Sequence, residues 1–313
     1  MKVRAAQGAG PARAGRTRDR SSVHQRPGVI WALPAFAYFL VFAVVPLILV
    51  VGLSFTHWSG LGTPRWAGAA NWSRLTEDAT LGSSIKLSLI LTTVAWLVQT
   101  PLSLLLGVWA AAPGRGRAVL SAVFFVPLLM SNAAVALLWQ SLLDPNFGLA
   151  ELIGPLLGAS DGNILGDPDR ALAAMALVVS WQFIPFHMLL YQAATRQIPQ
   201  SLYEAAAIDG AGRVRQFFAI TLPQLRHTIV SSSVLIVVGS LTYFETILLI
   251  TEGGPGTATR VLPLHMYITG FQAFEMGYAS ALAVLLVVAG TALSIGIVRM
   301  TGYWRMDSSR EGM

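Results

Sequence analysis

A polar segment between two strongly apolar stretches of the chain carries acidic and small residues at helical spacing. Glu204 and Asp209 supply carboxylates that can pair with basic groups, while Ala205 and Ala206 let another backbone approach closely. Gly210 permits a sharp turn after them, because glycine tolerates backbone angles that other residues avoid. These residues predict ion pairing and close docking against a second protein. By spacing alone, an amphipathic helix lying on the membrane surface explains the segment equally well.

A second set of residues could hold a ligand by hydrogen bonding and ring stacking. Asn132, Gln182 and Ser240 lie near the middles of three apolar stretches, where polar side chains are costly and usually face a bundle interior or a water-filled path. Aromatic rings that could stack on a sugar ring occur close to them, at Trp181, Phe183, Phe186 and Tyr243. The alternative is that the polar groups only join helices to one another, as small polar residues in membrane bundles often do.

Covalent chemistry on this chain is not expected. It contains no cysteine, and its five scattered histidines show no metal-ligand spacing. Neither of its two lysines, Lys2 and Lys86, follows a glycine, so the sequence has no phosphate-binding loop of the G-x-x-x-x-G-K type. We therefore predict that the chain is not an enzyme and that any ATP hydrolysis linked to it occurs on a partner.

The elements that position these residues are predicted to be membrane-spanning helices. Only 12% of the residues are charged, about half the usual share of roughly 25% in soluble domains. Six mainly apolar stretches of about 20 residues or more are long enough to cross a hydrocarbon core of roughly 30 Å. We expect them at Val29–Leu53, Leu87–Ala111, Ala118–Leu142, Ala171–Ala194, Ile229–Thr251 and Ala279–Met300. Pro101 and Pro185 fall inside two of these spans and are expected to interrupt their hydrogen-bond ladders.

The charge distribution predicts that both termini lie in the cytoplasm. Sixteen of the 21 lysines and arginines fall in or beside residues 1–28, 112–117, 195–228 and 301–313, whereas nine of the 15 acids fall in the remaining loops. We therefore expect a multi-pass protein of the bacterial cytoplasmic membrane. It would have a disordered basic arm at 1–28, a six-helix domain at 29–300 with its long cytoplasmic loop at 195–228, and a tail at 301–313.

The order of residues in the polar segment resembles the EAA–G signature of permease subunits in binding-protein-dependent ABC importers. The matching residues are Glu204-Ala205-Ala206, Asp209-Gly210-Ala211, Phe217, Ile220 and Leu222-Pro223. A second element, from Thr251 to Thr259, is similar to the T-x-G-G-P-x-x-x-T element of the carbohydrate-uptake branch, the maltose and glycerol-phosphate type. Further segments show weaker similarity to the same family, and together with these two elements they extend the resemblance over most of residues 30 to 300. One departure lies in an external loop, where Ala150 and Glu151 follow Phe147-Gly148-Leu149 although an asparagine is common there.

This resemblance implies the type I ABC importer permease fold and a set of partners. In that family the loop is a coupling helix that sits in a cleft of a cytoplasmic ATPase dimer, and the ATPase binds ATP and Mg. The implied ATPase-coupling residues are Glu204, Ala205, Ala206, Asp209, Gly210 and Phe217. Glu204 would pair with a basic residue of the ATPase, Gly210 would give the tight turn, and Phe217 would pack two short helices together. A second homologous permease subunit, an extracytoplasmic solute-binding protein and a sugar complete the implied machine.

The resemblance also places a sugar site at mid-depth in the membrane. With Asn132, the residues on this substrate path are Val135, Gln182, Phe183, Phe186, Ser240 and Tyr243. Ser240 and Tyr243 are three residues apart and are expected to share a helix face, with Glu245 pointing roughly the opposite way. No basic cluster occurs at this depth, so a neutral mono- or oligosaccharide fits better than glycerol phosphate, and a polyol stays open.

Two further alternatives remain at this stage. An ion-coupled secondary transporter or a membrane scaffold would need no ATPase, although Glu245 is the only acid within a predicted span. Downstream of the fifth span, the glycines around Pro255 force a chain reversal. The apolar residues that follow predict an amphipathic helix at the outer mouth, either capping the cavity or lying at the interface: Leu262, Met266, Ile268, Phe271 and Phe274.

Overall fold

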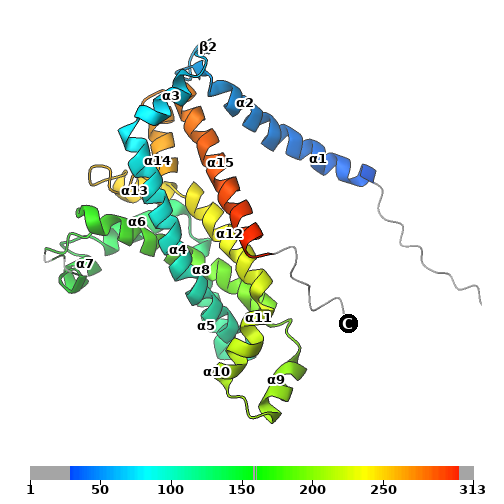
Figure 1. The fold of residues 1–313 in the computed structure, drawn as a ribbon. Coiled ribbons are helices and arrows are strands. Elements are labelled where there is room, and N and C mark those ends of the chain that lie inside the picture. Colours follow the sequence, from blue (N-terminus) through cyan, green and yellow to red (C-terminus); the bar gives the residue numbers. More distant parts are fainter. Residues whose placement is uncertain (1–28, 158, 160, 303–313) are drawn as a thin grey trace, which may run out of the picture. The chain divides into compact units, whose positions relative to one another are not determined.

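The computed structural model describes residues 29–157, 159 and 161–302 (Figure 1). The arm expected at 1–28 and residues 303–313 of the expected tail lie outside the described residues. Nearly all secondary structure in the described part is helical, with one antiparallel pairing of β1 (Thr56–His57) and β2 (Arg65–Trp66). The expected all-α class is confirmed. The chain divides into two compact units, one ending at Leu47 and the other starting at Ile48.

The first unit is helical over all its described residues. Its elements are η1 (Val29–Ala32), α1 (Leu33–Phe39) and η2 (Leu40–Val44), followed by α2 (Val45–Leu53), which continues into the second unit. Residues Leu33–Leu53 are long and apolar enough to cross a membrane. The structure therefore supports the first expected span.

The second unit contains the remaining helices. In chain order these are α3 (Ala70–Glu77), α4 (Ala79–Ala111), α5 (Arg115–Leu129), α6 (Asn132–Leu142), α7 (Leu149–Ile153), η3 (Pro155–Leu157), α8 (Pro168–Thr195), α9 (Gln200–Ile208), α10 (Arg213–Gln216), η4 (Phe217–Thr221), α11 (Leu222–Gln224), α12 (Arg226–Thr242), α13 (Glu245–Thr251), α14 (Leu262–Tyr267), η5 (Ile268–Gln272) and α15 (Met276–Met300). Helix α4 packs along α8, and α12 packs against both α4 and α15 (Figure 1). Helix α13 packs against α6, which brings the ends of two expected spans together.

The third expected span, Ala118–Leu142, is not one straight helix. Helices α5 and α6 meet at an angle of 100° around Met130 and Ser131. The Ser131 side chain accepts a hydrogen bond from the Ala134 amide and so caps the start of α6. The expected span thus consists of two helices joined at a sharp bend, because a capping serine starts a new helix inside an unbroken apolar stretch.

The fifth expected span, Ile229–Thr251, is also interrupted. Helix α12 ends at Thr242, and Tyr243 follows with an extended ψ of 115° before α13 begins at Glu245. Apolar composition continues across the break, so hydropathy alone could not reveal it.

The described residues contain four helices that are long and apolar enough to span a membrane, or up to six if each of two bent helix pairs is one span. The second such pair is Arg213–Gln224 with Arg226–Thr242, which bend by 68°.

The second expected span begins earlier than predicted, at Ala79 instead of Leu87. Asp78 caps this helix, because its carboxylate accepts hydrogen bonds from the amides of Thr80 and Leu81. Pro101 and Pro185 lie inside α4 and α8, which continue through them. The helices are continuous, but the hydrogen-bond ladder of each lacks one bond at its proline, because proline has no backbone N–H to donate.

A buried side-chain amide ties the loop after α2 to α3, and a backbone amide ties the same loop to the start of α15. The Asn71 side chain donates hydrogen bonds to the carbonyl oxygens of Ser54, at 2.9 Å, and Thr56, at 2.8 Å. The amide of Gly277 donates to the carbonyl oxygen of Trp58 at 3.1 Å. A Cβ atom on Gly277 would lie 1.9 Å from the Thr56 oxygen, so only glycine fits this close approach.

Candidate functional site

Four side chains from three helices and the break after α12 form a chain of hydrogen bonds. Gln182, on α8 and only 3% exposed, donates to the Asn132 side-chain oxygen at 3.0 Å and accepts from the Tyr243 hydroxyl at 2.7 Å. The Tyr243 oxygen also lies 2.6 Å from the Thr246 hydroxyl on α13. The structure therefore brings together Asn132, Gln182 and Tyr243, three of the residues expected on the substrate path.

Glu245 joins the same network from its other end. The Asn132 amide donates to a carboxylate oxygen of Glu245, so α13 contacts α6 through this pair. Glu245 thus contacts a neighbouring helix through a residue of the expected path. Thr246 was not predicted as part of the site, although it is only 1% exposed. Its only signal in the sequence is a hydroxyl group three residues after Tyr243.

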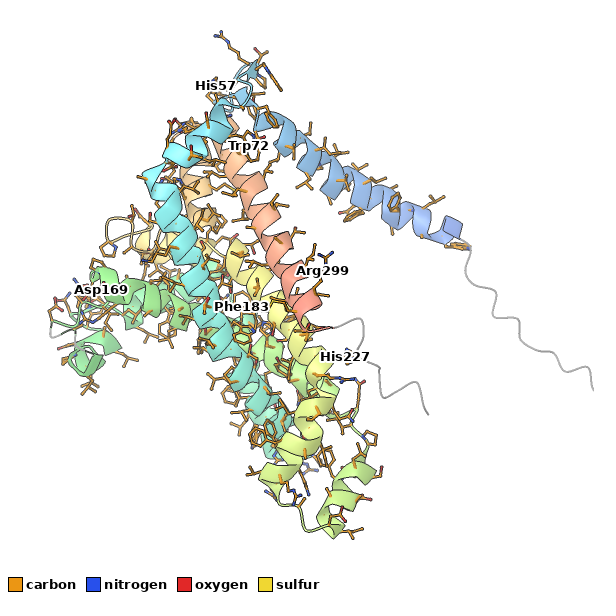
Figure 2. All side chains as sticks on the ribbon, viewed as in Figure 1. His57, Trp72, Asp169, Phe183, His227 and Arg299 are labelled. Atoms are coloured by element: carbon orange, nitrogen blue, oxygen red, sulfur yellow. The ribbon has the colours of Figure 1, made fainter. Side chains whose placement is uncertain are left out.

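The other expected path residues lie around this network in different ways. Phe183 is labelled in Figure 2. Its ring on α8 packs edge-on against the Tyr243 ring, with centroids 5.6 Å apart. Val135 is fully buried in the same apolar cluster. Phe186 is 36% exposed and packs on His187 instead. Ser240 is buried on α12 without joining the network, and the helix-face argument for it does not extend to Tyr243, which lies past the helix end.

Two further polar contacts between spans were missed at the sequence level. His187 on α8 lies 2.8 Å from the hydroxyl of Ser232 on α12, and the Trp96 indole on α4 donates to the neighbouring Ser233 at 2.8 Å. These buried pairs join helices, as polar groups in membrane bundles often do. The alternative reading of polar residues as interhelical contacts therefore holds for these positions.

The expected coupling loop folds into a short helix with a glycine-dependent end. Helix α9 is followed by Gly210 at φ +77°, which is a left-handed conformation that favours glycine. The Gly210 amide donates to the Ala207 carbonyl, and the Ala211 amide donates to the Ala206 carbonyl. This pair of bonds forms a Schellman motif. Gly212 has an ordinary φ of −68°, so the turn depends on Gly210 alone.

The side chains of this loop are presented to the outside of the described chain. Glu204, Ala205 and Asp209 are exposed, and Ala206 is partly exposed. Two apolar side chains beside them are also exposed, Ile208 at 87% and Val214 at 73%. A surface that combines free carboxylates with large apolar groups is typical of a docking site.

The second half of the loop is anchored on the helices instead. Phe217 is partly buried and packs on a cluster formed by Leu104, Tyr191 and Leu225. The hydroxyl groups of Tyr203 on α9 and Thr221 on η4 lie 2.9 Å apart, which links the two parts of the loop. Tyr203 was not predicted to have this role. These contacts join the exposed helix α9 to the part of the loop that packs on α4 and α8.

Among the described residues, no group of three or more histidine, aspartate or glutamate side chains could hold a metal ion. The arrangement is suited to binding and to mechanical coupling.

Comparison with known proteins identifies a family. Residues 103–301 match the family described as "Binding-protein-dependent transport system inner membrane component". The chain is 31% identical over 293 residues to the probable ABC transporter permease protein YesP of Bacillus subtilis, covering 91% of this chain and 93% of that protein. It is 31% identical over 271 residues to the multiple sugar-binding transport system permease protein MsmF of Streptococcus mutans, covering 82% and 91%. The fold is also similar to that of a bacterial ABC transporter involved in the import of the acidic polysaccharide alginate, with a TM-score of 0.76, 24% identity and coverage of 89% and 96%.

Proposed function

Because the chain belongs to the binding-protein-dependent transport system inner membrane components, we propose that it carries a neutral mono- or oligosaccharide through an ABC importer. As a member of that family it is a multi-pass permease subunit of the inner membrane with the type I importer fold, and it is not itself catalytic. A binding protein and an ATPase belong to such a system. Because the chain belongs to this family, an ABC importer is favoured over the two alternatives that the sequence left open, an ion-coupled secondary transporter and a membrane scaffold.

The observation that carries the proposed cargo is the hydrogen-bonded network of Asn132, Gln182 and Tyr243 beside the Phe183 ring. Sugars need fixed donors and acceptors for their hydroxyl groups and a flat apolar face for the ring. The network includes no basic side chain and ends on the carboxylate of Glu245. An anionic cargo such as glycerol phosphate would be repelled there, since like charges at close range disfavour each other. The name of the relative from Streptococcus mutans also refers to sugars.

We assign the remaining expected path residues to the walls of this pathway. Val135 would shape it next to the network, and Phe186 and Ser240 would line it further along α8 and α12. A second permease subunit would supply the opposite wall. The exposed side of Glu245 would then face that subunit or the cargo.

The coupling role is assigned to Glu204, Ala205, Ala206, Asp209, Gly210 and Phe217. The exposure of Glu204, Ala205 and Asp209 and the Schellman turn at Gly210 support a preformed helix that docks into the partner ATPase, which would hold ATP and Mg. Phe217 would pass the movement of the ATPase to the cluster at the ends of α4 and α8. The extracytoplasmic solute-binding protein would deliver sugar to the opposite side of the membrane.

The test has a docking arm and a cargo arm. Tagged chain is recovered from native membranes in mild detergent, and a second permease and a P-loop ATPase are expected to co-purify. Glu204→Arg should lose the ATPase, while Glu151→Arg, an exposed acid outside this loop, should keep it. The complete importer is then reconstituted in vesicles, and uptake of radiolabelled neutral sugars is compared with uptake of glycerol phosphate. Recovery of the chain alone would refute the coupling role, and faster uptake of glycerol phosphate would refute the neutral cargo.

A further inference from the structure

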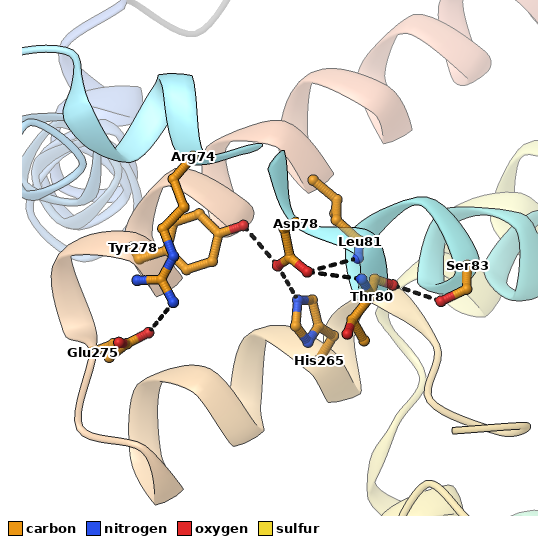
Figure 3. Close-up of polar contacts among 8 residues, drawn as sticks. All are labelled: Arg74, Asp78, Thr80, Leu81, Ser83, His265, Glu275 and Tyr278. Carbon is orange, nitrogen blue, oxygen red and sulfur yellow. Dashed lines mark hydrogen bonds and ion pairs between the residues drawn. The ribbon is translucent and has the colours of Figure 1, made fainter. Parts of the chain in front are cut away.

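A polar cavity of about 620 Å³ lies where the start of α4 meets α14, η5 and the start of α15 (Figure 3). It shares no lining residue with the network described above, and its residues fall in loops and helix starts that the charge distribution predicts to be outside the cell. Its lining residues include three acids, two arginines and a histidine: Glu77, Asp78, Glu275, Arg74, Arg260 and His265. The volume falls within the range of roughly 300–1,000 Å³ that ligand pockets occupy.

Asp78 forms a wall of the cavity and has no acceptor capacity left. One carboxylate oxygen accepts from the amides of Thr80, at 2.8 Å, and Leu81, at 3.2 Å. The other accepts from the Tyr278 hydroxyl at 2.8 Å and lies 2.9 Å from the His265 ring nitrogen Nε2. Burial alone would raise the pKa of Asp78, but these hydrogen bonds outweigh burial and lower the pKa to about 2. Asp78 is therefore a charged and saturated structural group.

Arg74 and Glu275 also neutralise each other. Their side chains form an ion pair at 2.8 Å, and the Arg74 guanidinium lies over the Tyr278 ring, 4.2 Å from its centroid. Figure 3 shows this pair next to the Asp78 cluster. His265 is mainly neutral near pH 7, because burial lowers its pKa despite the hydrogen bond with Asp78.

Several lining groups form no hydrogen bond or ion pair among the described residues, including the buried Nε atom of Arg260 and the buried Nδ1 atom of His265. The Arg260 guanidinium forms no ion pair or hydrogen bond there, and neither does the exposed carboxylate of Glu77. Thr269 is only 5% exposed, yet its hydroxyl group also lacks a hydrogen-bond partner. Buried polar atoms without a partner, such as Arg260 Nε and His265 Nδ1, are costly and are usually satisfied by a ligand or an ordered water. The cavity thus offers an occupant one cation, one anion, the Thr269 hydroxyl and a ring nitrogen of His265.

We propose that this cavity is a second binding site for a neutral polyhydroxyl ligand, a sugar or a polyol, separate from the path through Gln182. A ligand hydroxyl can accept from the Arg260 guanidinium while it donates to the Thr269 oxygen or the Glu77 carboxylate. Because Arg74 and Glu275 cancel, a phosphate or carboxylate ligand would meet the charges of Asp78 and Glu77, and a metal cation would meet that of Arg260. Only a neutral ligand that both donates and accepts satisfies all the unpaired groups. The site goes beyond the proposed function, because transport through the membrane path does not require it.

The test uses the full chain in lipid nanodiscs at pH 7.5, with glucose, maltose and mannitol as neutral probes. Binding is measured by saturation-transfer NMR titration. Thr269→Val, which removes the hydroxyl but keeps the shape, should weaken binding of the preferred probe by about fivefold or more. Thr269→Ser should restore it, which separates loss of the hydroxyl from loss of folding. Arg260→Gln should weaken binding to a similar extent.

The arms of this experiment separate the two sites. A Gln182→Leu variant, altered only at the membrane path, should keep the binding that Thr269→Val loses. If Gln182→Leu abolishes all binding and Thr269→Val leaves it unchanged, the second site is overturned while the proposed transport function stands. Tighter binding of inorganic phosphate or glucuronate than of every neutral probe would mean an anion site and would also overturn the proposal. Absence of saturable binding for all probes would show that the cavity holds water only.

Discussion

The hydroxyl oxygen of Tyr243 lies 2.7 Å from the side-chain oxygen of Gln182, so the break after α12 is held to the middle of α8 by a buried hydrogen bond. This contact places the two residues most central to the candidate substrate path next to each other. It also fixes the orientation of the Gln182 amide, whose nitrogen donates to Asn132.

We expect Tyr243→Phe to raise the sugar concentration needed for half-maximal uptake by about tenfold. The change leaves the Gln182 oxygen buried without a donor, which costs roughly 1–3 kcal/mol. Uptake by the reconstituted importer provides the measurement. Tyr267→Phe is the matched control, because the Tyr267 ring packs on Phe244 but its hydroxyl has no hydrogen-bond partner among the described residues. Equal effects of the two changes would remove Tyr243 from the path.

The turn after α9 is expected to tolerate substitution at Gly212 but not at Gly210. Neither position has an atom within 4 Å of an added Cβ, so the two differ only in backbone conformation. Gly210 adopts φ +77°, where a residue with a Cβ costs roughly 1–2 kcal/mol. Gly210→Ala should reduce the amount of co-purifying ATPase by about fivefold, whereas Gly212→Ala should leave it unchanged. Parallel losses in both variants would argue against a role for the turn.

Gly277, at the start of α15, provides a steric test of the close contact between this helix and the loop after α2. An alanine methyl there would clash with the Thr56 carbonyl oxygen at 1.9 Å, and the Asn71 side chain at 3.2 Å leaves no room to shift. We expect Gly277→Ala to destabilise the chain by about 1–3 kcal/mol or more, the usual cost of overpacking. Thermal unfolding in detergent measures this effect. Gly296→Ala on the same helix has open space and should not destabilise the chain. A Gly277→Ala variant that is as stable as the unmodified chain would show that the close approach of Gly277 to Thr56 is dispensable.

Part of this architecture could be predicted from the sequence, because apolar length and small-residue order are local signals. The helical spans and the turn at Gly210 depend on such signals and were expected. The break at Ser131 was not, since a serine in an apolar stretch indicates a helix cap or a buried hydroxyl equally well. The contact between Thr246 and Tyr243 depends on the second break, and the link from Asn71 to Thr56 depends on a fold of the chain that hydropathy does not report.

Stability is expected to fall as the pH decreases below about 6.5. Burial lowers the pKa of His265 in the folded chain. The hydrogen bonds that the Asp78 carboxylate accepts lower the pKa of Asp78 to about 2. Both groups therefore bind more protons when unfolded than when folded, so acid favours unfolding, first through His265 and only below about pH 4 through Asp78. The charged groups facing His265 are Asp78, Arg74 and Arg260.

The measurement is the unfolding midpoint of the full chain between pH 7.5 and 5.5. The decrease over this range should be smaller in His265→Gln, which cannot titrate. His57→Gln is the control, because His57 is exposed and should leave the pH profile unchanged. A steeper decrease in His265→Gln than in the unmodified chain would contradict the assignment.

Two glycines of α4 should respond to alanine in opposite directions. A Cβ on Gly107 would lie 2.7 Å from both the Met188 carbonyl oxygen and the Tyr191 Cβ, because α4 and α8 approach closely at this point. Small residues permit such contacts between membrane helices. Gly107→Ala should therefore lower the unfolding midpoint, with a cost of about 1–3 kcal/mol. Gly82 has open space, so Gly82→Ala should instead stabilise the helix by roughly 0.5–1 kcal/mol. If both variants were stabilised, α4 and α8 would not be in contact at Gly107.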